Sequence, residues 1–369
     1  MQSSTKKLDH LVSVRGLAAW LVVLFHSSAL WYSAVPQTPL SLLRAVEHGY
    51  LAVDFFFVLS GFIIFINYYE KFDVHFGHNS LIFYWNRISR IYPVHLLMLG
   101  AYLLLCAAFL YRSASHSLPD GYTFSEFWRS LFLVHAWGDT ALSWNVPSWS
   151  ISAEWFVYLW FPVIASCLRR GVRSVASHVI AVICTLILIV VIYNAVDAES
   201  LGSMRPGMLL TRALCEFLLG ALAGSMYIYH AAVLQRVRTA VVLSIIVVLA
   251  VMEAFAPPNY VTIPFLFFLL VVTLVTDKGW LSRSLSSRVL VYLGEISYST
   301  YLVHYFVYDV FKAGWVHGGE QVSVVALLAS FAVVLLMSML MYKFVEIPAQ
   351  TFLRGGLWAR HSGPLRFRH

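Results

Sequence analysis

Two ionisable side chains lie eleven residues apart in the first apolar segment of the chain, LDHLVSVRGLAAWLVVLFHSSAL. On a helix, Arg15 and His26 would fall within roughly 20° of each other and about 16 Å apart along the axis. Ionisable groups at membrane depth are costly and by default mark a functional site. Arginine binds anions and histidine accepts protons, so this spacing predicts a site that extends across a bilayer.

Other ionisable residues in apolar segments separate by their expected depth. With the N-terminus in the cytoplasm, Arg15, Arg87 and Arg90 are expected towards the inner side, where guanidinium groups suit a phosphate-bearing ligand. The outer half is expected to hold acids and bases of the kind that general catalysis requires. These outer residues are His26, Asp54, Glu154 and His304.

Each of these residues also has a structural interpretation. A single intramembrane His or Asp often pairs across helices without doing chemistry. Arg87 and Arg90 would equally mark the inner end of a membrane span. Ser60 and Gly61 are more typical of close helix packing.

Composition sets the fold class. Of 369 residues, 60% are hydrophobic and 12% are charged, whereas about a quarter of an ordinary soluble protein is charged. We therefore expect an all-α polytopic membrane protein, with a membrane domain over 1–350 and a basic cytoplasmic tail over 351–369. About ten stretches are long enough to span a bilayer: 8–32, 48–68, 91–111, 149–168, 175–195, 207–229, 238–256, 260–276, 290–311 and 321–345.

The distribution of basic residues tests this topology. With the N-terminus inside, 18 of the 25 Lys and Arg residues fall in inner segments and five in outer loops, while Arg15 and Arg212 lie within spans. Such a bias predicts that both termini face the cytoplasm. The net charge of +7 is explained in this way, and no nucleic-acid partner is expected.

An amphipathic segment and the four cysteines are two smaller features of the sequence. Segment 78–90, HNSLIFYWNRISR, is amphipathic and predicts a helix lying at the cytoplasmic interface. The four cysteines have neither metal-ligand spacing nor a disulfide framework, so no metal site is expected. They are Cys106, Cys167, Cys184 and Cys215.

Six strings in the same order along the chain carry a resemblance to a known family. They are LDHLVSVRGLAAWLVVLFH, VDFFFVLSGFII, WNRISRIYPVHLL, PSWSISAEWFVYLWFPVI, GEISYSTYLVHYFV and FVEIPAQ. With them the chain resembles the membrane-bound acyltransferase-3 family, whose members O-acylate extracytoplasmic sugars. The positions that match the family's motifs are Arg15, His26, Asp54, Ser60, Gly61, Arg87, Arg90, Glu154, Tyr301, His304, Glu346 and Pro348.

The resemblance implies a reaction and a role for each motif. The donor would be a cytoplasmic acyl-CoA, most often acetyl-CoA, used as a co-substrate with no bound cofactor. Its phosphates would meet Arg87 and Arg90, and Arg15 in addition. His26 would be the general base or a transient acyl carrier, and Glu154 would orient His26 or bind the sugar. The acceptor pocket would be shaped by Asp54, Tyr301 and His304.

The implied partners are acyl-CoA, a surface polysaccharide or glycoside, and the lipid bilayer of a bacterial inner membrane. Two departures from the family pattern are visible. The sequence before Arg15-Gly16 is altered, and Trp155 replaces a common second acidic residue. An esterase-like C-terminal domain, fused to some relatives, is not expected here.

Alternatives remain open at this point. One alternative is an enzyme that transfers succinyl or another acyl group to a lipid-linked or small glycoside. A different class is a proton-coupled glycan transporter, with the outer acids and bases as a proton relay. The chain has no visible internal repeat, which disfavours the transporter.

Overall fold

The computed structural model describes residues 8–73, 75–112, 121–138, 142, 144–203, 205, 207–315 and 322–355. Within these ranges the fold is helical and contains no strand. The α-helices are α1 (Asp9–His26), α2 (Ser28–Ala34), α3 (Leu40–Glu47), α4 (Ala52–Tyr68), α5 (Phe76–Arg112), α6 (Phe124–Leu131), α7 (Trp149–Gly171), α8 (Val175–Ala195), α9 (Met208–Tyr229), α10 (Ala231–Arg236), α11 (Arg238–Phe255), α12 (Asn259–Thr276), α13 (Trp280–Leu285), α14 (Arg288–Glu295), α15 (Ser297–Trp315), α16 (Val324–Met341) and α17 (Ile347–Gly355).

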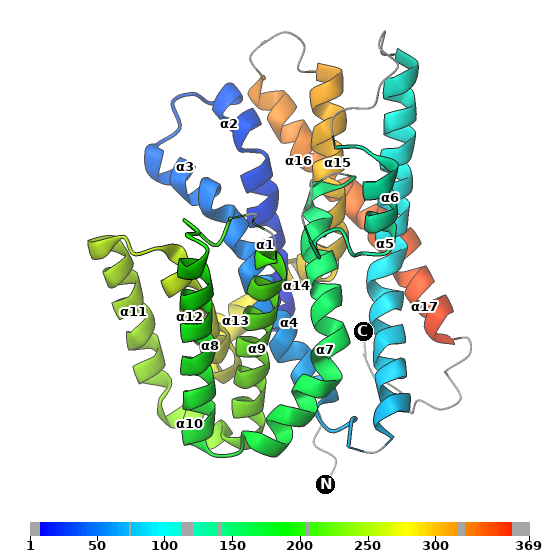
Figure 1. The fold of residues 1–369 in the computed structure, drawn as a ribbon. Coiled ribbons are helices and arrows are strands. Elements are labelled where there is room, and N and C mark those ends of the chain that lie inside the picture. The colour runs from blue at the N-terminus through cyan, green and yellow to red at the C-terminus, as the bar shows by residue number, and fades with distance from the viewer. Residues whose placement is uncertain are drawn as a thin grey trace.

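Three shorter elements connect these helices. Two are 3₁₀ helices, η1 (His48–Leu51) and η2 (Val146–Ser148), and one is a π-helical turn, η3 (Tyr342–Glu346). Figure 1 shows that most of the long helices run side by side, with α11 at one edge of the bundle and α5 with α17 at the other.

Nine described segments are long and apolar enough to cross a bilayer, which confirms the expected all-α membrane protein. They are Asp9–His26, Leu42–Tyr68, Phe76–Tyr111, Val146–Gly171, Val175–Ala195, Met208–Tyr229, Arg238–Phe255, Asn259–Thr276 and Val324–Gly355. The other predicted span, 290–311, is divided between α14 and α15. α15 has 19 residues but is not among the nine. The cytoplasmic location of both termini stays a prediction.

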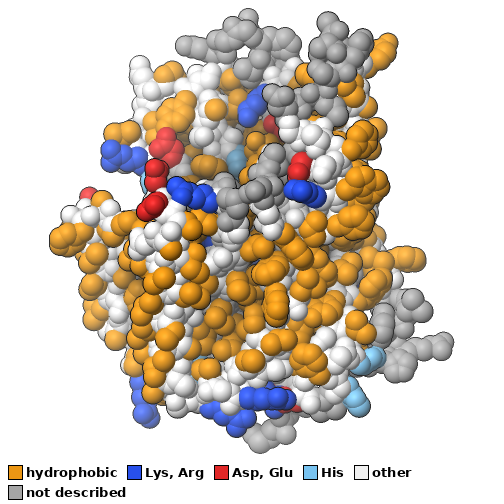
Figure 2. All heavy atoms as spheres, in the orientation of Figure 1, with side chains coloured by type: hydrophobic (Ala, Val, Ile, Leu, Met, Phe, Trp, Pro, Cys, Tyr) orange, Lys and Arg blue, Asp and Glu red, His pale blue; other side chains and the backbone are white. Residues whose placement is uncertain are grey.

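The outer surface of the bundle is suited to lipid. α11 has no buried residue although most of its side chains are apolar, which is typical of a helix that faces hydrocarbon. Figure 2 shows apolar side chains over much of one face, with Lys and Arg side chains at its lower edge. This arrangement fits a protein whose middle contacts acyl chains and whose edges contact water.

Two expected boundaries differ in the structure. The predicted interfacial helix 78–90 is continuous with the span that follows it, because α5 runs unbroken for 37 residues with Pro93 inside it. The pre-proline residue does not end the helix here, although a proline usually favours such an end. At the other end of the chain, α17 continues past residue 350 to Gly355, and residues 356–369 of the expected tail lie outside the described residues.

Small residues let α4 and α9 approach closely. A Cβ added at Gly220 of α9 would lie 1.8 Å from the backbone oxygen of Val58 in α4. A Cβ at Gly61 of α4 would lie 2.0 Å from the oxygen of Phe217 in α9. Small residues at membrane helix interfaces allow this backbone contact, so Gly61 serves packing, as its sequence context suggested.

Candidate active site

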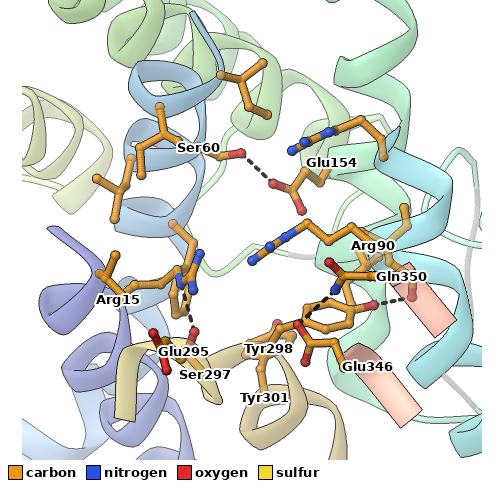
Figure 3. A pocket seen from close by; sticks show the side chains of 18 of the residues that line it. Arg15, Ser60, Arg90, Glu154, Glu295, Ser297, Tyr298, Tyr301, Glu346 and Gln350 are labelled. Atoms are coloured by element: carbon orange, nitrogen blue, oxygen red, sulfur yellow. Dashed lines mark hydrogen bonds between the residues drawn. The ribbon is translucent and has the colours of Figure 1, made fainter. Parts of the chain in front are cut away.

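A cavity of about 530 Å³ opens among α1, α4, α5, α7, α14, α15, η3 and α17. Four arginines and four carboxylates line it, so their formal charges cancel. Figure 3 shows several of these side chains pointing into the same space from different helices. The eight residues are Arg15, Arg87, Arg90, Arg354, Asp9, Glu154, Glu295 and Glu346.

Arg15 is held by neutral acceptors. Its Nη2 donates to the backbone oxygen of Gly294 at 2.7 Å, and its Nε donates to the hydroxyl of Ser297 at 2.9 Å. The contact is possible because α1 and α14 touch at two glycines, where a Cβ on Gly16 would lie 2.6 Å from the backbone nitrogen of Gly294. Acceptors without charge orient the guanidinium but leave its positive charge available to a ligand.

Arg87 and Arg90 reach the cavity from the first half of α5. The Arg87 guanidinium lies 5.7 Å from the ring centre of Tyr68 and 5.8 Å from that of Tyr158, and aromatic faces attract cations. Its Nε is buried and has no hydrogen-bond partner among the described residues. The guanidinium of Arg90 points into the cavity in Figure 3.

No ion pair within the described residues joins any of these four arginines to a carboxylate. A buried or half-buried guanidinium without such a pair is well suited to a ligand with negative charge. The structure therefore brings together the three arginines expected at an inner anion site. Their role in donor binding stays a prediction.

The sequence did not identify Arg354, the fourth arginine of the cavity. It lies in α17, and its Nε donates to the hydroxyl of Ser89 on α5 at 3.2 Å. The π-helical turn η3 comes immediately before α17 and places Tyr342 and Glu346 in the cavity wall. Such turns are rare and occur often at functional sites. A usable signal was present in the matched string FVEIPAQ, but Arg354 itself was counted only as a tail charge.

Glu154 belongs to the arginine cavity. Its carboxylate accepts a hydrogen bond of 2.6 Å from the hydroxyl of Ser60 on α4. The side chain that hydrogen-bonds His26 is His304, and a role of Glu154 in orienting His26 or binding the sugar stays a prediction. Ser60 thus has a polar role that the packing interpretation of the sequence missed.

His26 forms a pair with His304 of α15. The Nδ1 of His26 lies 3.0 Å from the Nε2 of His304, and their ring centres are 5.0 Å apart. His26 is partly exposed, whereas His304 has an exposed fraction of 0%. Both were predicted site residues of the outer half, and neither lines the cavity.

Tyr301 connects the histidine pair with the cavity. It lines the cavity, and its ring centre lies 5.9 Å from that of His304. Its hydroxyl donates to the backbone oxygen of Pro147 at 2.9 Å and lies 2.7 Å from the hydroxyl of Ser150. The cavity therefore ends one aromatic side chain away from the two imidazoles.

Asp54 is paired with an arginine of another helix, and its role in an acceptor pocket stays a prediction. Its carboxylate receives two hydrogen bonds from Arg212 of α9, the one from Nη2 being 2.6 Å long. Both side chains are almost fully buried, at 0% and 2% exposure, and Asp54 does not line the cavity. The Arg212 guanidinium also lies 5.4 Å from the ring centre of Trp149.

A signal for this pair was present in the sequence. Charged residues within membrane spans usually pair with one another, and Asp54 and Arg212 both lie in predicted spans. Glu216 of α9 is also fully buried, and neither of its carboxylate oxygens has a hydrogen-bond partner among the described residues. Asp54 thus belongs to a buried charge cluster between α4 and α9.

Fold and site together define a polytopic helical membrane protein with an arginine-lined cavity on one side of a histidine pair. The model of the acyltransferase-3 family, described as an acyltransferase domain, matches residues 10–343. The chain belongs to this family and is an acyltransferase, which confirms the resemblance seen in its six strings.

Three relatives named as acyltransferases or O-acetyltransferases agree with this class. The chain is 28% identical to the acyltransferase MdmB of Streptomyces mycarofaciens over 94% of its own length and 92% of that protein. It is 22% identical to the O-acetyltransferase OatA of Staphylococcus aureus over 94% of its length, but it spans only 57% of OatA. A putative O-acetyltransferase of S. aureus strain COL, SACOL0978, is 23% identical, with 97% of the chain and 60% of the relative aligned. No solved structure matches the chain.

Proposed function

We propose that this protein transfers an acyl group, most often acetyl, from cytoplasmic acyl-CoA to a hydroxyl group of an extracytoplasmic sugar or polysaccharide. The enzyme would act in a bacterial inner membrane. The family and the O-acetyltransferase names among the relatives support the acyl chemistry. The acceptor class follows from the resemblance of the motifs.

One observation carries the proposal. Arginines that form no ion pair with any described residue line a cavity beside the N-terminal part of α1, and His26 is the last residue of the same helix. The phosphates of coenzyme A match guanidinium groups in charge and geometry. A partly exposed imidazole matches the need for a proton acceptor near the hydroxyl that reacts.

The proposed reaction balances without any other reactant. An imidazole nitrogen of His26 accepts the proton of the acceptor hydroxyl while its oxygen attacks the thioester carbonyl carbon. The carbon–oxygen bond forms, the carbon–sulfur bond breaks, and the leaving thiolate takes the proton back from the imidazolium. A positioned general base contributes typically 10²- to 10⁴-fold.

A covalent version of the reaction uses the same residue. In it, a nitrogen of His26 attacks the thioester first and carries the acyl group until the hydroxyl displaces it. In both versions His26 must offer an unprotonated nitrogen, and the donor phosphates stay at the arginines.

The direct test is the ester content of surface glycans in cells with and without this protein. We expect O-acetyl esters that disappear with the gene and return with the wild-type chain. The Arg236→Ala variant is a suitable control and should also restore the O-acetyl esters, because Arg236 is exposed in α10 and does not line the cavity. An identical ester content on all surface glycans with and without the protein would refute a polysaccharide acceptor.

A further inference from the structure

We infer that His304 is a positioning residue that fixes the tautomer of His26, so that the reactive nitrogen of His26 is Nε2. The inference rests on the proposed function, because it assigns the atom of His26 that would accept the proton or carry the acyl group. It also gives His304 a role other than shaping the acceptor pocket.

A backbone carbonyl sets the direction of the hydrogen bonds. The Nδ1 of His304 lies 3.2 Å from the oxygen of Thr300, one turn earlier in α15. A carbonyl oxygen only accepts, so Nδ1 of His304 must carry the proton of this hydrogen bond. In a neutral imidazole the other nitrogen is then an acceptor, so Nε2 of His304 has a lone pair.

This lone pair faces His26. Since Nε2 of His304 accepts, the nitrogen 3.0 Å away, Nδ1 of His26, must donate. A neutral His26 that is protonated at Nδ1 has its own lone pair at Nε2. This series of hydrogen bonds, from His26 to His304 to Thr300, thus leaves the free lone pair of His26 on its Nε2, which His304 does not contact.

The surroundings of His304 favour its neutral form. The side chain has an exposed fraction of 0%. Its ring contacts are His26 and three tyrosines, Tyr301, Tyr305 and Tyr308, and no carboxylate forms an ion pair with it among the described residues. An isolated charge at such a position would be costly. A neutral His304 therefore donates from Nδ1 to the oxygen of Thr300 and accepts at Nε2 from His26.

The same contacts argue against a direct role in acceptor binding. Both ring nitrogens of His304 are engaged, one with Thr300 and one with His26. The fully buried ring has no polar atom left for a sugar hydroxyl. His26 is the partly exposed member of the pair, and its ring is fixed further by an edge contact with Tyr305 at 5.1 Å.

The first test reads the tautomer itself and needs no acyl transfer. Protein labelled with ¹⁵N at histidine is reconstituted in lipid, and the His26 signals are identified by their loss in His26→Gln. We expect a protonated Nδ1 and an unprotonated Nε2 in wild type, and a loss of this preference in His304→Leu. Protonation at Nε2 in the wild type would overturn the inference whether or not the protein transfers acetyl groups.

The second test separates positioning from acceptor binding. His304→Leu should lower kcat roughly 10- to 100-fold, the range found when the orienting partner of a metal-bound histidine is lost, with little change in either KM. His304→Gln should recover part of the loss, because its amide oxygen can accept from Nδ1 of His26. A raised KM for the acceptor with unchanged kcat would instead indicate a binding role and contradict positioning.

The chain offers a matched control on α8. His178 is also fully buried, with Nδ1 2.8 Å from the oxygen of Ser174, four residues earlier, and Nε2 2.8 Å from the hydroxyl of Ser225. His178→Leu removes the same kind of contacts away from the site, so kcat of the folded protein should stay unchanged. An equal loss of kcat in His178→Leu would mean that the effect of His304→Leu is structural.

A double variant completes the experiment. If His304 acts only through His26, then His26→Gln combined with His304→Leu should be no slower than His26→Gln alone, since residues that act as a unit are not additive. A further loss in the double variant would contradict the inference. No transfer by the wild type from any acyl-CoA would refute the proposed function, while the tautomer would still be decided by the nitrogen signals.

Discussion

Four arginines from three helices meet in the cavity, and three of them have contacts with groups other than carboxylates. Arg15 contacts a backbone oxygen and a serine hydroxyl, and Arg354 contacts the hydroxyl of Ser89. Arg87 lies against aromatic rings. Neutral contacts of this kind keep a cation in place without neutralising it, which an anion site requires.

The arginines of α5 give the first prediction. Arg87→Ala and Arg90→Ala should each raise the KM for acyl-CoA, because loss of a charge-assisted hydrogen bond costs about 1.5–3 kcal/mol, or roughly 10- to 150-fold in transition-state binding. Lysine at either position should recover only part of this, since a point charge lacks the guanidinium fork. The measurement is the dependence of the initial rate on acyl-CoA concentration.

Arg236→Ala is the control for this series, because it removes one exposed charge outside the cavity. An unchanged KM for acyl-CoA in both α5 variants would mean that Arg87 and Arg90 serve topology and not donor binding.

At this scale the sequence predicts some residues and not others. Arg15, Arg87, Arg90 and Glu154 are recognisable because each interrupts or flanks an apolar stretch. The pairing of Asp54 with Arg212 joins residues that are 158 positions apart, and no local pattern specifies such a contact. Arg354 was missed because the helix that contains it begins beyond the last apolar span.

At the scale of helices, the hydropathy pattern located most spans correctly, but it did not locate the junctions between neighbouring helical segments. The predicted interfacial helix 78–90 and the span 91–111 are parts of one helix, α5, which continues through Pro93. The π-helical turn η3 left no trace in hydropathy, because one extra residue in a turn does not change the average of a long window. Both junctions, the one within α5 and the turn η3, position residues of the cavity. The parts of the helices that are hardest to predict therefore contain much of the site.

The contact of α4 with α9 gives a prediction at this scale. Gly220→Ala should destabilise the protein by about 1–3 kcal/mol, typical of overpacking, because a Cβ there would lie 1.8 Å from the oxygen of Val58. Gly100→Ala in α5 is the control, because a Cβ at Gly100 meets nothing within 4 Å. Thermal unfolding in detergent measures both. Equal melting temperatures for the two variants would show that the close contact does not contribute.

The end of α12 gives a pH-dependent prediction. Burial raises the pKa of Asp277, but hydrogen bonds from Ser282 and Gly279 and the charge of Arg238 outweigh it, so the pKa lies below its ordinary value of 3.8. A lowered pKa in the folded state stabilises the protein above the ordinary value, and this contribution is lost as the pH falls through the folded value.

Asp277→Asn should therefore lower the melting temperature at pH 7, and its difference from wild type should shrink below about pH 4. Unfolding curves of the two proteins from pH 8 to pH 3 provide the measurement. A difference that stays constant over this whole range would show that the charge of Asp277 is not involved.

At the scale of the whole molecule, the proposed reaction requires the two ends of the site to face opposite sides of the membrane. Arg15 and His26 lie on one helix about 16 Å apart along its axis. A donor that enters from the cytoplasm and an acceptor that enters from outside would then meet near Tyr301 and His26. The bundle between these points must exclude water from the thioester.

The topology behind this arrangement is testable by cysteine labelling. In a background without the exposed Cys167 and Cys184, a cysteine at Arg170 or Arg236 should react with an impermeant maleimide only from the cytoplasmic side. A cysteine at Glu199 should react only from the outside. Labelling of all three positions from one side would overturn the predicted orientation.

The most direct test of the central claim uses reconstituted vesicles with labelled acetyl-CoA on the cytoplasmic side of the protein and surface glycan on the other. We predict that wild type forms labelled glycan esters and that His26→Gln is slower by about 10²- to 10⁴-fold, because glutamine keeps much of the volume and hydrogen bonding of histidine but is not a base. His178→Gln is the matched control and should remain active. Full transfer by a well-folded His26→Gln protein would contradict the account, as would a wild type that forms no ester.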